Sequence, residues 1–279
     1  MMRTQSDAAI GMQAASLAGE LLLQLRQAAV TGEVASVALD ADALRAAGDR
    51  DANHAIMKLL ANERPEDSLL SEEAADDPRR LIAERVWIID PLDGTREFGE
   101  QDSAGVWRDD FAVHVALWER GHGLTLGVVG LPARGVIYSS DARTVVPPSP
   151  AGPLRIAVSR TRPPGFIAAL ESAGSAKLLP MGSAGVKVMA VVSGEADAYI
   201  HAGGQYQWDS AAPVAVALAA GLVATRLDGS PLKYNVPELL LPDLVVCHPD
   251  RADEVRLLLD AAGFGLDGAS GAGAAESAG

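Results

Sequence analysis

Cysteine and aromatic residues are scarce in this sequence, and both scarcities limit what the fold can be. Cys247 is the one cysteine among 279 residues, so no intramolecular disulfide can form, and we expect a reducing, cytoplasmic environment. It follows the apolar run 244–246, which predicts a buried thiol rather than a nucleophile. Aromatic residues make up 4% of this 48% hydrophobic chain, so its core must consist mainly of Ala, Val, Leu and Ile.

Basic residues are also few. The chain has 23 Lys and Arg against 37 Asp and Glu, a formal net charge of -14. This balance argues against nucleic-acid polymers and anionic membranes as partners. A small anionic substrate stays compatible with it, because bound divalent cations can reverse the charge locally. No uninterrupted apolar run approaches the roughly 18 residues of a membrane span, and no signal-like segment opens the chain, so we expect no membrane association.

The spacing of apolar residues predicts alternating helices and strands. In the first half we expect helices at 7–30 and 50–62, an acidic loop at 72–77, and strands at 86–89, 111–117, 124–129 and 135–138. In the second half we expect strands at 154–158 and 196–200 and around Val245 and Val246, with helices at 165–172, 184–193, 209–220 and 252–262.

A Pro- and Gly-rich run at 145–153 has the composition of a connector. We therefore expect an N-terminal α+β domain over 1–150 and a C-terminal α/β domain over 151–262. The small-residue-rich remainder, 263–279, is expected to be a disordered tail.

The stretch Asp90-Pro91-Leu92-Asp93-Gly94-Thr95 follows a hydrophobic strand. Asp90 and Asp93 are expected to converge on a tight turn, where Pro91 restricts the backbone and Gly94 permits an unusual backbone angle. Converging carboxylates repel each other unless cations lie between them, and hard oxygen ligands suit magnesium or manganese. An ordinary Asp-Gly surface turn is the alternative. A calcium loop fits less well, because its ligand spacing is absent.

Two further acidic residues are candidate metal ligands only in combination with this motif. Glu72 follows the apolar pair Leu69-Leu70 and is by itself typical of a solvated charge run. Asp209 stands at the expected start of an apolar helix, where N-capping is the ordinary explanation. Either residue becomes a candidate metal ligand if the fold brings it near Asp90.

The motifs resemble the inositol monophosphatase superfamily in type and order. The segments that carry the resemblance are Leu70-Ser71-Glu72-Glu73, Trp87 to Thr95, and Gly194 to Tyr199 followed by Trp208-Asp209. Within the superfamily the chain resembles the CysQ branch, phosphatases of 3'-phosphoadenosine 5'-phosphate, at Arg96-Glu97-Phe98, Val158-Ser159-Arg160, Gly182-Ser183-Ala184 with Lys187, and Asp228 to Asn235.

The resemblance implies an α-β-α-β-α sandwich of the inositol monophosphatase and fructose-1,6-bisphosphatase type, homodimeric, with two or three magnesium ions. Manganese is an expected substitute and lithium an expected inhibitor. One ion is implied at Glu72, Asp90 and the carbonyl of Leu92, a second at Asp90, Asp93 and Asp209, and a looser third at Glu72.

Site roles are implied in the same way. Thr95 and Asp49 are implied to position and deprotonate the attacking water, with Glu72 also catalytic, while the amides of Gly94 and Thr95 meet the phosphate. The implied substrate-binding residues are Glu72, Leu92, Asp93, Gly94, Thr95, Ser159, Arg160, Gly182, Ser183, Lys187 and Asp209.

The expected activity is therefore magnesium-dependent removal of the 3'-phosphate of 3'-phosphoadenosine 5'-phosphate, with the sulfated nucleotide as a further substrate. An inositol or fructose-1,6-bisphosphate phosphatase and a non-catalytic metal-dependent binding protein are the alternatives. The chain departs from the family pattern at Arg45 to Asp49, so a helix N-cap at Asp49 stays an alternative to its catalytic role. It departs again at Gly203 to Gln207, on the expected substrate side.

Overall fold

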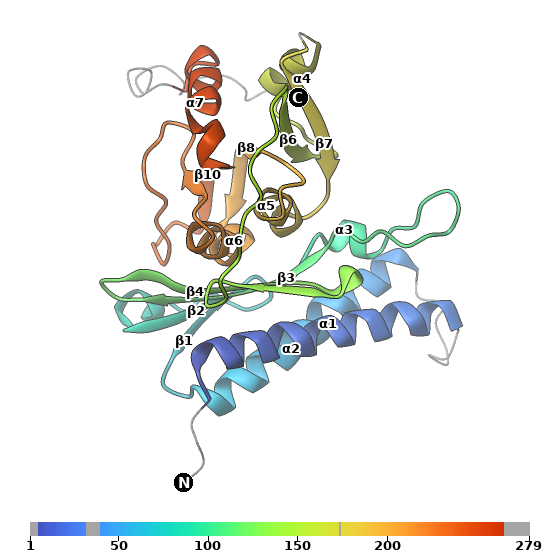
Figure 1. The fold of residues 1–279 in the computed structure, drawn as a ribbon. Helices are drawn as coiled ribbons and strands as arrows, with labels where there is room; N and C mark the ends of the chain where they lie inside the picture. Colours follow the sequence, from blue (N-terminus) through green and yellow to red (C-terminus); the bar gives the residue numbers. More distant parts are fainter. Residues whose placement is uncertain (1–4, 32–39, 173, 265–279) are drawn as a thin grey trace, which may run out of the picture.

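The computed structural model describes residues 5–31, 40–172 and 174–264. These residues stack in layers: a helix pair, a sheet, a second helix pair, a second sheet and outer helices (Figure 1). This is the layered α-β-α-β-α arrangement expected from the sequence. The predicted tail over 263–279 lies outside the described residues except for its first two positions.

The first layer consists of α1 (Asp7–Thr31) and α2 (Ala41–Glu63), which lie together against one face of the first sheet (Figure 1). Buried Ile10, Leu22 and Ile56 pack there with Trp87 of the sheet. By length and composition α1 could cross a membrane, since a window within Asp7–Val30 has a mean hydropathy of 1.2. Its apolar stripe, however, packs on the sheet, which accounts for its hydrophobicity as a core helix.

The first sheet has the order β1-β2-β3-β4-β5, parallel between its first two strands and antiparallel elsewhere. Its strands are β1 (Ser68–Ser71), β2 (Arg85–Asp93), β3 (Ala112–Glu119), β4 (Gly123–Leu131) and β5 (Val136–Ser139). Along β2, Trp87 and Ile89 face the first helix layer, whereas Val86 and Ile88 face the second. Burial on both faces explains why this strand reads as a continuous apolar run.

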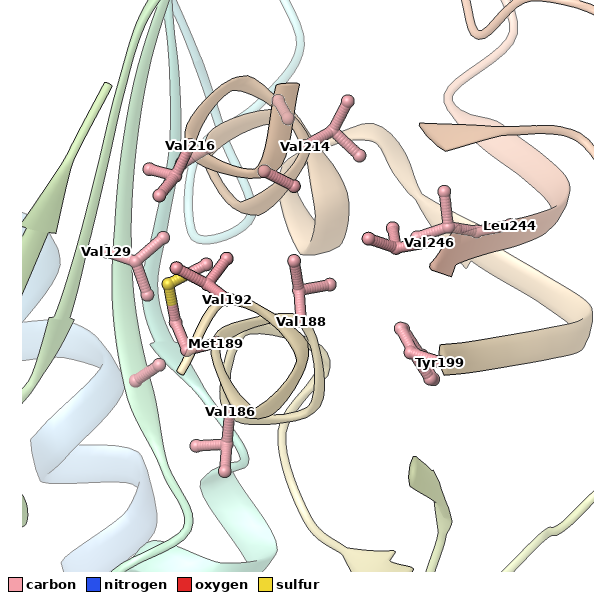
Figure 2. Packing of buried hydrophobic residues seen from close by; sticks show 14 of the residues in the cluster. Val129, Val186, Val188, Met189, Val192, Tyr199, Val214, Val216, Leu244 and Val246 are labelled. Atoms are coloured by element: carbon pink, nitrogen blue, oxygen red, sulfur yellow. The ribbon is translucent and has the colours of Figure 1, made fainter. Parts of the chain in front are cut away.

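The middle layer consists of α5 (Ala184–Val192) and α6 (Gln207–Ala219). Figure 2 shows Val192 and Met189 of α5 turned toward Val129 of the first sheet, while Val188 points toward Val246 of the second. All of α5 is buried, as an apolar helix between two sheets must be.

The second sheet has the order β7-β6-β8-β10-β9, with α4 and α7 outside it (Figure 1). Its strands are β6 (Leu154–Ser159), β7 (Ala176–Met181), β8 (Ala198–Tyr206), β9 (Val223–Thr225) and β10 (Leu240–Cys247), and its outer helices are α4 (Gly165–Ser172) and α7 (Ala252–Ala261). Cys247 is buried in the outer core as predicted, and burial raises its thiol pKa to about 12.

Most predicted elements are present, with three corrections. The second helix begins at Ala41 and not at 50, and its N-cap is Asp40, whose carboxylate accepts the amide of Ala43 at 2.8 Å. The capping interpretation of Asp49 is therefore wrong. The helix predicted from Asp209 begins at Gln207. The sequence also failed to predict β1, β7 and β9.

The segment after β5 leads to β6 at the position of the predicted connector. The division into domains at about residue 150 stays a prediction, because α5 and α6 belong to the second half of the chain but pack against both sheets.

A single glycine decides how closely α6 approaches the first sheet. A Cβ at Gly127 of β4 would lie 2.5 Å from the carbonyl oxygen of Ala212 and 2.6 Å from the Cβ of Ala215. We expect Gly127→Ala to lower the free energy of unfolding by about 1–3 kcal/mol, measured by urea denaturation, because the helix must move away.

Gly165→Ala is the matched control, since a Cβ there meets nothing within 4 Å. It should change the free energy of unfolding by less than about 1 kcal/mol. Equal effects of the two substitutions would contradict this account of the packing.

Candidate metal centre and substrate cavity

The acidic motif continues strand β2 rather than forming the predicted turn directly after it. Its register with β3 runs regularly to the pair Asp90 and His114, and shifts between Asp90 and Asp93. Such an irregularity lets a strand redirect its side chains, and the turn itself begins only at Gly94. Asp90 is fully buried; its Oδ1 accepts the amide of Leu92 at 3.0 Å, while its Oδ2 has no hydrogen-bond partner.

The four predicted acidic ligands act on one another electrostatically. Burial raises the pKa of Asp90 well above its usual range, and the charges of Glu72, Asp93 and Asp209 raise it further. Burial and Asp93 raise the pKa of Asp209 to about 8, although the amide of Tyr206 opposes the shift. Although Glu72 is exposed by its surface area, partial burial of its carboxylate and the charges of neighbouring carboxylates raise its pKa to about 7. The fold has therefore gathered carboxylates that raise one another's pKa values.

Asp93 joins the two halves of the chain. Its Oδ2 accepts hydrogen bonds from Ser183 Oγ at 2.5 Å and from the amide of Gly185 at 2.7 Å, both at the start of α5. The Nε2 atom of buried His114 lies 3.3 Å from the same oxygen. A Cβ at Gly185 would lie 2.1 Å from that nitrogen, so glycine is required for this approach.

Asp209 lies at the third position of α6, and its Oδ2 accepts the amide of Tyr206 at 2.7 Å. It does cap the helix, but from inside the first turn. Trp208 is almost buried and stacks on Tyr206 with ring centroids 4.7 Å apart, as expected of a packing residue.

Asp49 and Thr95 lie together although 46 positions separate them in the chain. Thr95 Oγ1 is 3.2 Å from Asp49 Oδ1 and 3.0 Å from the carbonyl of Leu92, and its one proton can serve only one of them at a time. Gly48 makes the approach possible, because a Cβ there would be 2.9 Å from Leu92 Cδ2. Burial and the charge of Glu73 raise the pKa of Asp49 to about 6.

The donor set fits a hard divalent cation in its chemistry. Several carboxylates, one buried oxygen without a donor, and raised pKa values are what a cation-binding cluster shows when its charge is not balanced. In the part of the chain that the structure describes, no three His, Cys, Asp or Glu side chains are yet arranged to hold a metal ion. Two of the carboxylates, Asp93 and Asp209, each accept a backbone amide with one oxygen, Oδ2.

A cavity of about 590 Å³ opens beside the acidic cluster. Eight of the predicted site residues line it: Asp93, Gly94, Ser159, Arg160, Gly182, Ser183, Lys187 and Asp209. Glu72, Asp90, Leu92, Thr95 and Asp49 are not among its lining residues. The predicted residues thus divide into a cavity group and a group at its acidic end.

The basic residues of the cavity differ in what they are bound to. Arg160 pairs with Glu97 at 2.7 Å and with Glu100 at 2.5 Å, and Lys187 Nζ donates to the carbonyls of Gly182 and Ser183 at 3.1 and 2.6 Å. Arg96 and Arg162 also line the cavity, and neither has a carboxylate within ion-pair distance among the described residues.

Sequence reasoning missed the residues that connect the two halves around this cavity. From the sequence, Glu97 is only the middle residue of the CysQ-like segment Arg96-Glu97-Phe98, whereas in the structure its carboxylate pairs with Arg160. Asp110 accepts the amide of Gly182 at 2.7 Å. No local pattern could reveal either contact, because each joins residues more than 60 positions apart.

One acidic residue of the motifs has a structural role. Asp197 is buried and pairs with Arg155 at 2.7 Å, and its Oδ1 also accepts the hydroxyl of Ser149. It anchors the connector to the second sheet, away from the cavity lining.

Comparison with known proteins agrees with this geometry. A protein of Mycobacterium tuberculosis named 3'-phosphoadenosine 5'-phosphate phosphatase is 50% identical over 252 residues, covering 88% of each chain. The 3'(2'),5'-bisphosphate nucleotidase CysQ of Escherichia coli K12 is 31% identical over 243 residues, 82% of this chain and 94% of that one. The crystal structure of CysQ from Bacteroides thetaiotaomicron superposes with a TM-score of 0.72 at 27% identity, covering 88% of this chain and 98% of that one.

The sequence pattern of the Inositol monophosphatase family matches residues 4–258, and that span contains every acidic residue of the candidate centre. With the layered fold and the acidic cluster in place, the chain belongs to the inositol monophosphatase family.

Proposed function

We propose that this protein is a phosphomonoesterase that removes the 3'-phosphate of 3'-phosphoadenosine 5'-phosphate and releases AMP and phosphate. The observation that carries the proposal is the shape of the charge distribution: a cavity with an acidic cluster at one end and basic side chains along its wall. The names of the relatives from Mycobacterium tuberculosis and Escherichia coli support the same substrate.

Magnesium is the proposed cofactor, in two or three positions. The residues that would hold it are Glu72, Asp90, Asp93, Asp209 and the carbonyl of Leu92. A bound divalent cation would neutralise the phosphate, acidify a water molecule and stabilise the departing alkoxide. Asp90 would serve as a metal ligand, since it is fully buried and its Oδ2 has no hydrogen-bond donor.

The protein itself supplies a base and a phosphate cradle. Asp49, with a pKa of about 6, is deprotonated at neutral pH and basic enough to accept the proton of an attacking water through Thr95, 3.2 Å away. Gly94 has a φ of +90°, which a non-glycine residue rarely adopts. This conformation turns the backbone so that the amides of Gly94 and Thr95 can meet phosphate oxygens.

The cavity has the size and the charges for a nucleotide with a second phosphate. Its volume lies within the range of small-molecule sites. Arg96 and Arg162, which no carboxylate neutralises among the described residues, are proposed to meet the 5'-phosphate. Arg160 is proposed to act mainly by holding Glu97, and Lys187, with two of its donors on carbonyls, to offer its third to the substrate.

Three properties that the family resemblance implies are proposed for this chain as well. We propose that it is a homodimer, that lithium inhibits it, and that it works in the cytoplasm, in keeping with its single cysteine. Sedimentation velocity and lithium titration of the activity test the first two.

Substrate preference separates the candidate functions. We expect kcat/KM for 3'-phosphoadenosine 5'-phosphate, with magnesium, to exceed that for inositol 1-phosphate, which has no second phosphate to meet the arginines, by at least about a hundredfold, the effect of two charge-assisted contacts. It should also exceed kcat/KM for fructose 1,6-bisphosphate, whose second phosphate is carried on a sugar and not on a nucleoside. A preference for either non-nucleotide would move the assignment to another branch of the family. Absence of turnover on all three, with magnesium bound, would indicate a binding protein.

Asp90→Asn tests the role of the buried carboxylate. We expect kcat to fall by more than about a hundredfold, because metal ions supply several kcal/mol of transition-state stabilisation. The variant should fold, since it removes charge from a repulsive cluster. Asp253→Asn, at an exposed position of α7, is the control and should keep full activity. Retained activity in Asp90→Asn refutes the role of Asp90 as a metal ligand.

The raised pKa values predict how magnesium stabilises the protein. With a chelator present, the folded state binds protons at Glu72 and Asp209 more tightly than the unfolded state does. This contribution is present at low pH and is lost as the pH rises through about 7 to 8. Magnesium should therefore raise Tm more at about pH 8 than at about pH 5.5, measured by circular dichroism.

Asp209→Asn should reduce this pH dependence, because one of the two groups no longer titrates. An equal magnesium effect at both pH values in the unmodified protein would show that the carboxylate cluster does not bind the ion.

A further inference from the structure

Arg26 is a buried arginine on α1, outside the cavity lining. Its guanidinium donates to three backbone carbonyls, those of Phe98 at 2.9 Å, Glu97 at 3.0 Å and Arg108 at 2.7 Å. None of the sequence motifs includes it. Because all three acceptors are backbone atoms, the contacts fix the path of the chain rather than a particular side chain.

Aromatic rings surround the same guanidinium. Its central carbon lies 4.9 Å from the ring centroid of Phe98, 5.0 Å from Trp107 and 4.3 Å from Phe111. Burial lowers the pKa of Arg26 to about 10, so the group is charged at neutral pH. A planar group with forked donors can serve three carbonyls and contact ring faces at once, which the single ammonium of lysine cannot do.

The three carbonyls lie at the two ends of one loop. Glu97 and Phe98 end the short helix α3 (Thr95–Phe98), which starts at the phosphate-cradling turn, and Arg108 lies where the chain returns to β3. Arg26 thus closes segment 99–107 and supplies donors to carbonyls at the end of α3. Both ends of the loop are held at one point.

Each end of that loop continues into a contact with the second half of the chain. On one side the Glu97 carboxylate pairs with Arg160 at 2.7 Å. On the other, Arg108 pairs with Asp110, which accepts the amide of Gly182 at 2.7 Å. Arg160 and Gly182 both line the substrate cavity.

Gly182 packs closely against Glu97 and Asp110. A Cβ at Gly182 would lie 2.4 Å from the Cδ atom of Glu97 and 2.9 Å from the carbonyl oxygen of Asp110. A small displacement of the loop would therefore separate the two walls of the cavity or force them into contact.

We propose that Arg26 is a positioning residue for the substrate cavity: by closing the 99–107 loop it sets Glu97 and Asp110, which hold the second half of the chain against the first. The inference rests on the proposed function for its substrate. A nucleotide that also reaches the arginines along the cavity wall depends on this alignment more strongly than a small phosphomonoester that occupies only the acidic end.

The test compares two substrates in Arg26→Lys: 3'-phosphoadenosine 5'-phosphate and p-nitrophenyl phosphate, both with magnesium. We expect the ratio of their kcat/KM values to fall by about tenfold, the effect of one lost charge-assisted hydrogen bond, mainly through KM for the nucleotide. Arg120→Lys is the matched control, because Arg120 also donates to two carbonyls, of Leu81 and Ala83, but lies outside the cavity lining. It should leave the ratio unchanged.

A second measurement does not depend on turnover. Hydrogen exchange of peptides covering 176–187 should be faster in Arg26→Lys and in Asp110→Asn than in the unmodified protein, with no change in Arg120→Lys. If Arg26→Lys does not fold, Asp110→Asn, which weakens the contacts of Asp110 with Arg108 and Gly182 and leaves Arg26 in place, decides both measurements.

The proposal is overturned if both substrates lose activity in equal proportion, or if exchange at 176–187 is unchanged. Failure of the proposed function looks different, since the unmodified protein would then not prefer the nucleotide, while the exchange result would still report on the loop.

Discussion

Mutual repulsion among the carboxylates around buried Asp90 is the constraint on which the rest of the structure depends. Asp90 is fully buried, and Asp93, Asp209 and Glu72 all raise its pKa. Placing these charges together is unfavourable without cations, so the surrounding scaffold must hold them in place. The layers do this: β2 carries Asp90 and is packed on both faces, while α6, which carries Asp209, lies between the two sheets. The packing of the layers is therefore what keeps these carboxylates close to one another.

The site lies where the two halves of the chain meet, and its contacts also hold them together. Asp93 reaches Ser183 and Gly185 at the start of α5, and Asp110 reaches the preceding Gly182. Both the acidic end, with Asp93 and Asp209, and the basic wall, with Arg96 and Arg160, combine residues from the two halves of the chain. This arrangement would give the proposed bisphosphorylated substrate a direction, with one phosphate toward the carboxylates and the other toward the arginines.

Prediction from sequence succeeded where an element is long and regularly apolar, and failed where its pattern is short or interrupted. The helix at 165–172 has the predicted bounds, and α1 differs by one residue. Strand β7 was missed because it lies at the edge of its sheet, where exposed Lys177 and Pro180 interrupt the apolar pattern. The start of α2 was misplaced because Asp49-Arg50 resembles a helix start, whereas Asp40 makes the capping bond.

The order and types of residues were enough to predict the acidic chemistry, because the motifs are local and each follows a recognisable apolar element. The layered fold was implied only by the family resemblance that these motifs carry. Only the packing of distant segments decided that Asp49 reaches Thr95, that Glu97 and Glu100 neutralise Arg160, and that Arg26 holds the loop beside the cavity. Contacts of this kind join residues tens of positions apart. They exist because helices and sheets pack at particular distances, which no local pattern of residues specifies.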